Sequence, residues 1–217
     1  LAGSLNLWNE IPVANKTSLP ASSIHRRLYH SDIQSLTQIL SRADMEGRNR
    51  PSSTIELPVA NGQIQLFTVE ESPIMAAGLA AKYPAIKTYR IFGIDDPATS
   101  GRLSISPKGL NAMLTGPSGT FYIDAQSEGV YSAYRRNKQQ SVEPFNCGVS
   151  GHTHQTPLGD DIASRPAYRT PGSLLVYRLA VAATSEYISS VGGTTQAALD
   201  AIVIAINRVN QIYERDL

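Results

Sequence analysis

The sequence predicts an α+β protein: a β-rich domain with two short helices, followed by one further strand and a long helix. Two patterns indicate this fold class. Between residues 53 and 136, short stretches of alternating polar and apolar residues recur between turn residues, as they do in antiparallel sheets. Near residues 31–43 and 195–215, the apolar residues recur at helical spacing instead.

The composition narrows the class of protein. Hydrophobic residues make up 41% of the 217 residues, which is enough to bury a core. The formal net charge of +1 gives no long-range attraction, so neither nucleic acid nor a membrane is expected as a partner. The sequence contains no run of about eighteen apolar residues, so no membrane-spanning helix is expected. Low charge with thirteen prolines, sixteen glycines and one cysteine fits an exported bacterial protein, either secreted or held in the periplasm or at the cell surface.

The first helix is expected over residues 31–43, with Ser31 as its N-cap. Its apolar residues fall at helical spacing and should face the core: Ile33, Leu36, Ile39 and Leu40. Residues 1–28 before it are expected to be irregular, with Trp8 as a packing anchor.

The central part of the chain predicts a hairpin and a meander. Asn61-Gly62 is a hairpin signal between two alternating stretches, and Gly116-Pro117-Ser118-Gly119 marks a later turn. A short helix is expected over residues 74–82, because Pro73 can open it and Pro84 follows its end. The expected strands are residues 54–59, 63–69, 88–94, 102–106, 109–115, 120–124 and 130–136.

The chain changes character after residue 136. Residues 137–172 have no period and contain four prolines, which is typical of a linker between domains. Residues 174–184 form an apolar run bounded by turn residues and predict a buried strand. A long helix is expected over residues 195–215, with Thr194 as its N-cap.

This last helix is strongly amphipathic. Its apolar face comprises Leu199, Ile202, Val203, Ile206, Val209, Ile212 and Tyr213. Its other side is polar through Asp200, Asn207, Arg208, Asn210 and Gln211. One strand and one helix cannot close a core of their own, so this unit must pack on the first domain, on further chain, or on both.

The only cysteine, Cys147, lies in the linker. A lone thiol is a buried small side chain, a nucleophile or a metal ligand, and the sequence leaves these alternatives open. With His152 and His154 it has the spacing Cys-x4-His-x-His, which could form a local metal site. Asp160 and Asp161 offer a carboxylate as another metal ligand.

Several stretches together resemble one protein family. Residues 67–75 and 83–89 are similar to the propeptide domain of bacterial reprolysin-like zinc metalloproteases, which are metzincins of the M12B type. Residues 177–182, followed by residues 207–217, look like the first strand and first helix of their catalytic domain. The resemblance covers roughly residues 50–217, and its last block is the most specific part.

The resemblance implies a secreted zinc endopeptidase that is made as a zymogen. Residues 1–136 would be the propeptide domain, residues 137–172 an inhibitory and activation segment, and residues 173–217 the truncated start of the catalytic domain. The propeptide would keep the protease latent and assist its folding. The zinc-binding motif His-Glu-x-x-His-x-x-Gly-x-x-His is not present in this sequence. Zinc is therefore expected as the cofactor of the full-length enzyme only, and this fragment is expected to be inactive alone.

The family resemblance also assigns roles within the linker. Cys147-Gly148-Val149 matches the core of the cysteine switch of related zymogens, in which a thiolate fills the open coordination position of the catalytic zinc. The implied partners are the chain's own catalytic domain and an activating protease, for which Arg165 and Arg169 are candidate cleavage positions. The alternative hypothesis is a non-enzymatic β-rich binding or adhesion module.

Overall fold

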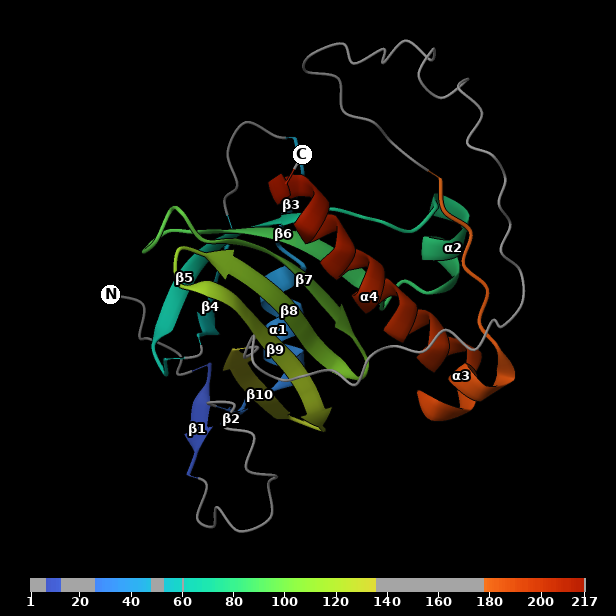
Figure 1. Cartoon of the computed structure of the whole chain (residues 1–217), viewed down its shortest axis with the longest axis horizontal. Coiled ribbons are helices and arrows are strands. Elements are labelled where there is room, and N and C mark those ends of the chain that lie inside the picture. Colours follow the sequence, from blue (N-terminus) through green and yellow to red (C-terminus); the bar gives the residue numbers. More distant parts are fainter. Residues whose placement is uncertain (1–6, 13–25, 48–52, 60, 136–177, 217) are drawn as a thin grey trace, which may run out of the picture. The chain divides into compact units, whose positions relative to one another are not determined.

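The computed structural model describes residues 7–12, 26–47, 53–59, 61–135 and 178–216. In these residues a ten-stranded sheet forms the centre of the fold, with strand order β1-β2-β10-β9-β8-β7-β6-β5-β3 and with β4 paired to β5 (Figure 1). All pairs are antiparallel except β3 with β5, which is parallel. The β-rich α+β class predicted from the sequence is confirmed.

The sheet contains two short N-terminal strands and a long antiparallel meander. The strands are β1 (Asn9–Ile11), β2 (Arg27–His30), β3 (Asp44–Met45), β4 (Ser53–Pro58), β5 (Ile64–Glu71), β6 (Lys87–Gly93), β7 (Ser100–Ser106), β8 (Gly109–Gly116), β9 (Gly119–Ser127) and β10 (Val130–Arg135). The helices are α1 (Ile33–Leu40), α2 (Ala77–Lys82), α3 (Ser185–Ser190) and α4 (Thr195–Asp216). Among these helices none is both long and apolar enough to cross a membrane.

The hydrophobic core lies between α1 and one face of the sheet. Figure 1 shows α1 behind the strands, where Leu36 and Leu40 are fully buried. Every second residue of the central strands faces this core, because side chains alternate between the two faces of a sheet. Trp8 is 4% exposed, makes edge contacts with Tyr29 and Tyr131, and is the packing anchor that the sequence predicts.

The structure corrects two helix boundaries. The N-cap of α1 is Asp32, not Ser31: its carboxylate accepts a hydrogen bond from the Ser35 amide at 2.8 Å. The amide of Ser31 instead donates a hydrogen bond to the carbonyl of Gly129, in the turn between β9 and β10. Helix α2 begins at Ala77 and not at residue 74. The Asn61-Gly62 hairpin is confirmed, and Gly62 has φ +92°, a conformation that glycine adopts without strain.

The expected strand over residues 174–184 is not found in its described part. Residues 178–184 have no regular secondary structure, and Leu179 is 66% exposed. A strand is stable only when a neighbouring strand completes its hydrogen bonds, and no described strand pairs with this stretch. The short helix α3, which the sequence analysis missed, follows at Ser185.

Contacts between residues divide the chain into two units, residues 139–182 and the remaining 1–138 with 183–217. Helix α4 therefore belongs to the same unit as the sheet. It begins as predicted, because the Thr194 hydroxyl accepts a hydrogen bond from the Ala197 amide at 3.1 Å. It lies across β7 and β8 on the face opposite to α1 (Figure 1).

Candidate functional site: a polar seam between α4 and the sheet

The sheet face under α4 is polar. In β7, Gly101, Leu103 and Ile105 face the core, whereas the residues between them face α4: Ser100, Arg102, Ser104 and Ser106. Neighbouring strands continue this face, because the register places Thr88 and Arg90 of β6 beside β7. A sheet face of this kind cannot hold a helix by hydrophobic packing alone.

Helix α4 meets this face with its polar side. Its buried residues are Ala197, Ala198, Asp200, Val203, Asn207 and Gln211, and among them only Val203 is a large apolar residue. Asp200, Val203, Asn207, Gln211 and Glu214 follow one another at three- or four-residue spacing, so they share one side of the helix. We call the contact of this side with β7 and its neighbours the polar seam.

At the C-terminal end of α4, Glu214 binds Arg102. The Nε atom of Arg102 donates to Glu214 Oε2 at 3.1 Å, and its Nη2 atom donates to Glu214 Oε1. The third donor of Arg102, Nη1, reaches the hydroxyl of Ser72 at 2.7 Å. Arg90 also lies 3.8 Å from the Glu214 carboxylate. Arg102 is only 4% exposed, so Glu214 supplies the charge that a buried guanidinium requires.

The middle of the seam is held by hydrogen bonds between neutral groups and by an ion pair. The amide of Asn207 donates to the Leu103 carbonyl at 3.0 Å, and that of Gln211 donates to the Ser100 hydroxyl at 3.2 Å. Beside them, Arg208 forms an ion pair with Asp124 of β9.

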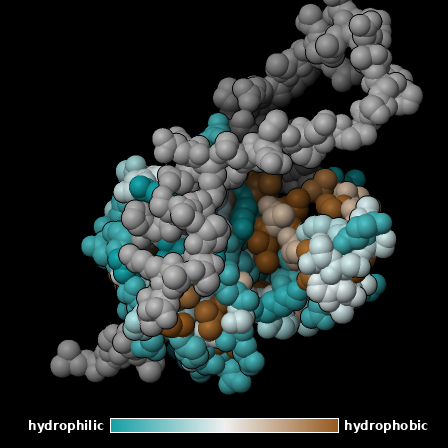
Figure 2. Space-filling model, turned by 60° about the horizontal axis from the view of Figure 1, so that its bottom comes forward, coloured by the Kyte–Doolittle hydropathy of each residue, from teal (hydrophilic) through white to brown (hydrophobic). Residues whose placement is uncertain are grey.

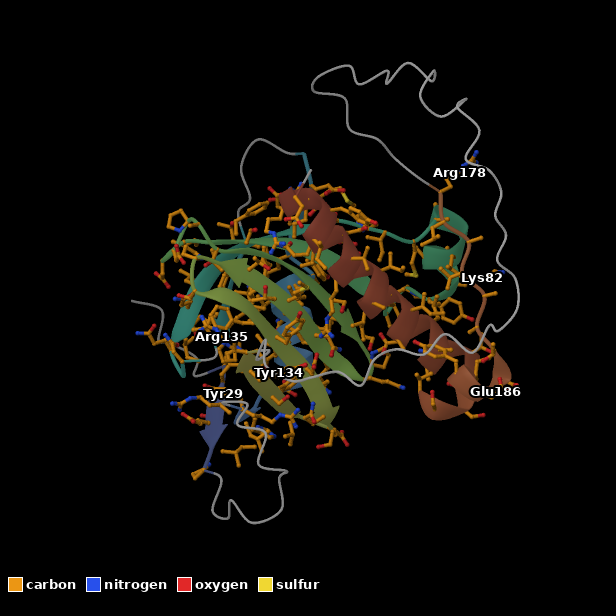
Figure 3. All side chains as sticks on the ribbon, viewed as in Figure 1. Tyr29, Lys82, Tyr134, Arg135, Arg178 and Glu186 are labelled. Atoms are coloured by element: carbon orange, nitrogen blue, oxygen red, sulfur yellow. The ribbon has the colours of Figure 1, made fainter. Side chains whose placement is uncertain are left out.

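Asp124 is shared between the helix and the sheet. Besides Arg208, it accepts a hydrogen bond at 2.6 Å from the hydroxyl of Tyr134, which is labelled in Figure 3. Burial, together with this hydrogen bond to a carboxylate, raises the pKa of Tyr134 above the ordinary tyrosine value. Tyr134 therefore stays protonated and donates at physiological pH.

At the N-terminal end of the seam, Asp200 accepts a hydrogen bond from the Ser106 hydroxyl at 2.8 Å. Asp200 is 4% exposed, and burial raises the pKa of its carboxyl group. The hydrogen bond from Ser106 and the charge of Lys108 oppose this rise without cancelling it. Lys108 itself donates to the Val191 carbonyl at 2.8 Å, just before α4.

Substitution of Asp200 by asparagine is expected to stabilise the protein at neutral pH, by about 1 kcal/mol. Because the pKa of Asp200 is raised on folding, its contribution is fully present below the unfolded pKa and is lost as pH rises through the folded value. Asparagine keeps a partner for Ser106 but carries no charge to bury. Urea unfolding between pH 3 and 8 should show the gain at pH 7 and none at the acid end. A less stable Asp200→Asn variant at pH 7 would show that pairing outweighs burial.

Most apolar residues of α4 lie outside the polar seam. Leu199, Ile202, Ile206, Val209 and Tyr213 follow at alternating three- and four-residue spacing and form a stripe that we call the apolar stripe. The first three are half-buried, whereas Val209 is 41% and Tyr213 60% exposed. Figure 2 shows hydrophobic residues gathered in a brown area in the right half of the view. A surface of this kind marks an interaction site more often than a free surface.

The predicted site residues lie outside the described residues. These are Cys147, His152, His154, Asp160, Asp161, Arg165 and Arg169, and their roles remain predictions. Within the described ranges, no three His, Cys, Asp or Glu side chains come together as they would around a metal ion. The described residues therefore do not fit a zinc site.

The sequence analysis did not identify the seam, although a signal was present. Serine or arginine at every second position of β7 is unusual for a central strand covered on both faces. The polar positions of α4 repeat at helical spacing and carry complementary groups. The two patterns could have been matched before the structure was known. No model of a protein family, no curated protein and no solved structure matches this chain.

Proposed function

We propose that this chain is the prodomain-containing part of a secreted zinc metalloendopeptidase zymogen, in which the sheet domain keeps the protease latent and assists its folding. The observation that carries the proposal is the orientation of α4. This helix gives its polar side to the sheet, whereas Val209 and Tyr213 at the C-terminal end of its apolar stripe are exposed. An amphipathic helix normally buries its apolar side, so we expect a second hydrophobic core to cover the apolar stripe.

In the proposal that second core is the sheet of a peptidase domain, and α4 is its first helix. The same helix then contacts two bodies at once: the prodomain through the polar seam and the peptidase through the apolar stripe. A prodomain that holds this helix in place could favour folding of the peptidase around it. The family resemblance of residues 207–217 supports the same assignment, whereas residues 178–182 do not form the strand that the resemblance implies.

Latency would come from Cys147. A thiolate is a strong zinc ligand, and in a zymogen it would take the position that the catalytic water needs. Gly148 follows it and has no Cβ, which lets the backbone approach closely. Zinc itself would be held by histidines of the peptidase domain, because the described residues offer no ligand set.

The test uses the complete coding sequence expressed as a zymogen. Cys147→Ala should make the protease active without prodomain cleavage, raising peptidase activity at least tenfold over the latent wild type, because one zinc position opens to water. Metal analysis should find one zinc ion per chain in both proteins.

Two outcomes would contradict parts of this proposal. If Asp160→Asn or Asp161→Asn releases activity and Cys147→Ala does not, a carboxylate is the inhibitory ligand. If the complete protein contains no zinc and no histidine triad, the chain is a non-enzymatic binding or adhesion module.

A further inference from the structure

The two helices that cover the sheet are attached to it by different forces. The α1 side is a continuous hydrophobic cluster in which Leu36, Phe67, Ile91 and Leu103 are completely buried. The α4 side combines a few buried apolar residues, Ala197, Ala198, Val203 and Met113, with hydrogen bonds and ion pairs between residues more than 80 positions apart in sequence. Folding removes such groups from water and returns a similar number of hydrogen bonds, so their net contribution is small, whereas apolar burial contributes fully.

The polar seam is specific despite this small net contribution. The chemistry of its pairs differs from one position of α4 to the next. In order along the helix, a carboxylate on α4 pairs with a hydroxyl of the sheet, an amide with a carbonyl, a guanidinium with a carboxylate, and a carboxylate with a guanidinium. A shift of the helix by one turn would place Glu214 and Asp200 beside the wrong groups, with unpaired buried charge as the penalty. The seam therefore selects one helix in one register.

The seam also contains buried polar atoms that lack a hydrogen-bond partner within the described residues. On α4 these are Oδ1 of Asn207 and Nε of Arg208, and on the same sheet face they are the hydroxyls of Thr115 and Ser132. A buried polar atom that has no partner in the closed contact gains one from water when α4 leaves, which lowers the stability of the contact. A surface that selects its helix well but holds it weakly is suited to reversible binding.

We propose that the polar face of β6–β9 is a docking surface from which α4 can be released while the rest of the sheet domain stays folded. Its ligand is a helix that presents a polar side with acidic, amide and basic groups in the order Asp200, Asn207, Arg208, Glu214. This inference rests on the proposed function only in naming α4 as the first helix of the peptidase domain. Release would free that helix together with the peptidase when the chain is cut between β10 and α4.

The test cuts the full chain once and asks whether the pieces stay together. A recognition sequence for a site-specific protease is inserted after Gly172, and the cleaved protein is examined by size-exclusion chromatography and by titration with salt. The two pieces should stay associated at low ionic strength. Raising the salt concentration from 0.05 to 1 M should weaken the association at least tenfold, because partly exposed ion pairs are screened.

A matched pair of substitutions separates the seam from general charge effects. Arg208 pairs with Asp124 across the seam, whereas Arg215 pairs with the adjacent Asp216 in solvent. Arg208→Gln should weaken the association of the cut pieces about tenfold, and Arg215→Gln should leave it unchanged. Equal effects of the two substitutions, or association that does not respond to salt, would overturn the proposal.

The fluorescence of Trp8 distinguishes release from unfolding. Trp8 lies in the core on the α1 side of the sheet, and it is the only tryptophan of the chain. Its emission should stay unchanged when α4 dissociates. A shift of Trp8 emission together with dissociation would show that α4 is part of the folding core and would refute the docking surface. That result would leave the zymogen proposal standing, since Cys147→Ala tests the latter independently.

Discussion

Replacement of Glu214 by alanine is expected to weaken the binding of α4 to the sheet by about 2 to 3 kcal/mol. The reason is the environment of its partner. Without Glu214, the buried guanidinium of Arg102 would keep the Ser72 hydroxyl as its side-chain hydrogen-bond partner within the described residues, and Arg90 lies beside it on the next strand. Arg90 would still lie 3.8 Å from the Glu46 carboxylate, whereas the buried Arg102 would have no carboxylate partner among the described residues. Hydrogen exchange should show loss of protection along α4.

The opposite substitution should cost less. Arg102→Met removes the buried charge and fills its space, while Glu214, whose side chain is 35% exposed, can turn to water. We expect a loss of about 1 kcal/mol for Arg102→Met. If Arg102→Met costs as much as Glu214→Ala, the pair acts through direct attraction and not through the demand of a buried charge. Asp216→Asn is the control for the loss of one negative charge at this end of α4, and no change in protection is expected for it.

Replacement of Trp8 by alanine is expected to lower the free energy of unfolding by about 3 to 5 kcal/mol. The indole ring is 4% exposed and packs edge-on against Tyr29 and Tyr131, with centroid distances of 6.4 and 5.2 Å. Its Nε1 atom donates to the Glu56 carbonyl at 2.6 Å, which ties the first described segment to β4. Denaturation followed by circular dichroism measures the effect without relying on the lost fluorophore.

Trp8→Phe separates the two contributions of this side chain. Phenylalanine keeps most of the aromatic packing but leaves the Glu56 carbonyl without its donor, so a smaller loss of about 1 to 2 kcal/mol is expected. If Trp8→Ala costs less than 1 kcal/mol, the first segment is not an integral part of the core.

The sequence predicts the strands from β4 to β10 well because local signals specify them. It misses β1, β2 and β3, and the expectation that residues 1–28 are irregular is wrong, because Asn9–Ile11 and Arg27–His30 pair with each other in the sheet. The Asn61-Gly62 turn, the alternation in the hairpin and meander, and the apolar spacing of Leu36 and Leu40 all depend on nearby residues. These elements agree with the structure within a few residues. The sequence does not distinguish Ser31 from Asp32 as the N-cap, because both residue types cap helices and only the position of the first turn decides between them.

The position of α4 could not be predicted in the same way. Its length and its N-cap at Thr194 follow from the sequence, but amphipathic spacing does not say which side meets which surface. The usual rule that the apolar side is the buried side fails here, because the available sheet face carries Arg102 and three serines. The strand expected before α4 fails for a related reason: apolar composition does not supply a neighbouring strand.

The orientation of α4 is the central claim, and two valines on different sides of the same helix test it directly. Val203 is 3% exposed and faces the sheet, whereas Val209 is 41% exposed in the apolar stripe. In a Cys147→Ala background, Val203→Cys and Val209→Cys are nearly equal changes in side-chain size. The rate of thiol labelling by a small reagent reports the accessibility of each position.

In this 217-residue chain, Val209→Cys should label at least a hundredfold faster than Val203→Cys. In the complete zymogen, both positions should be protected, because the peptidase domain would then cover the apolar stripe. Faster labelling at Val203→Cys in the 217-residue chain would mean that α4 packs by its apolar side, and it would contradict the account.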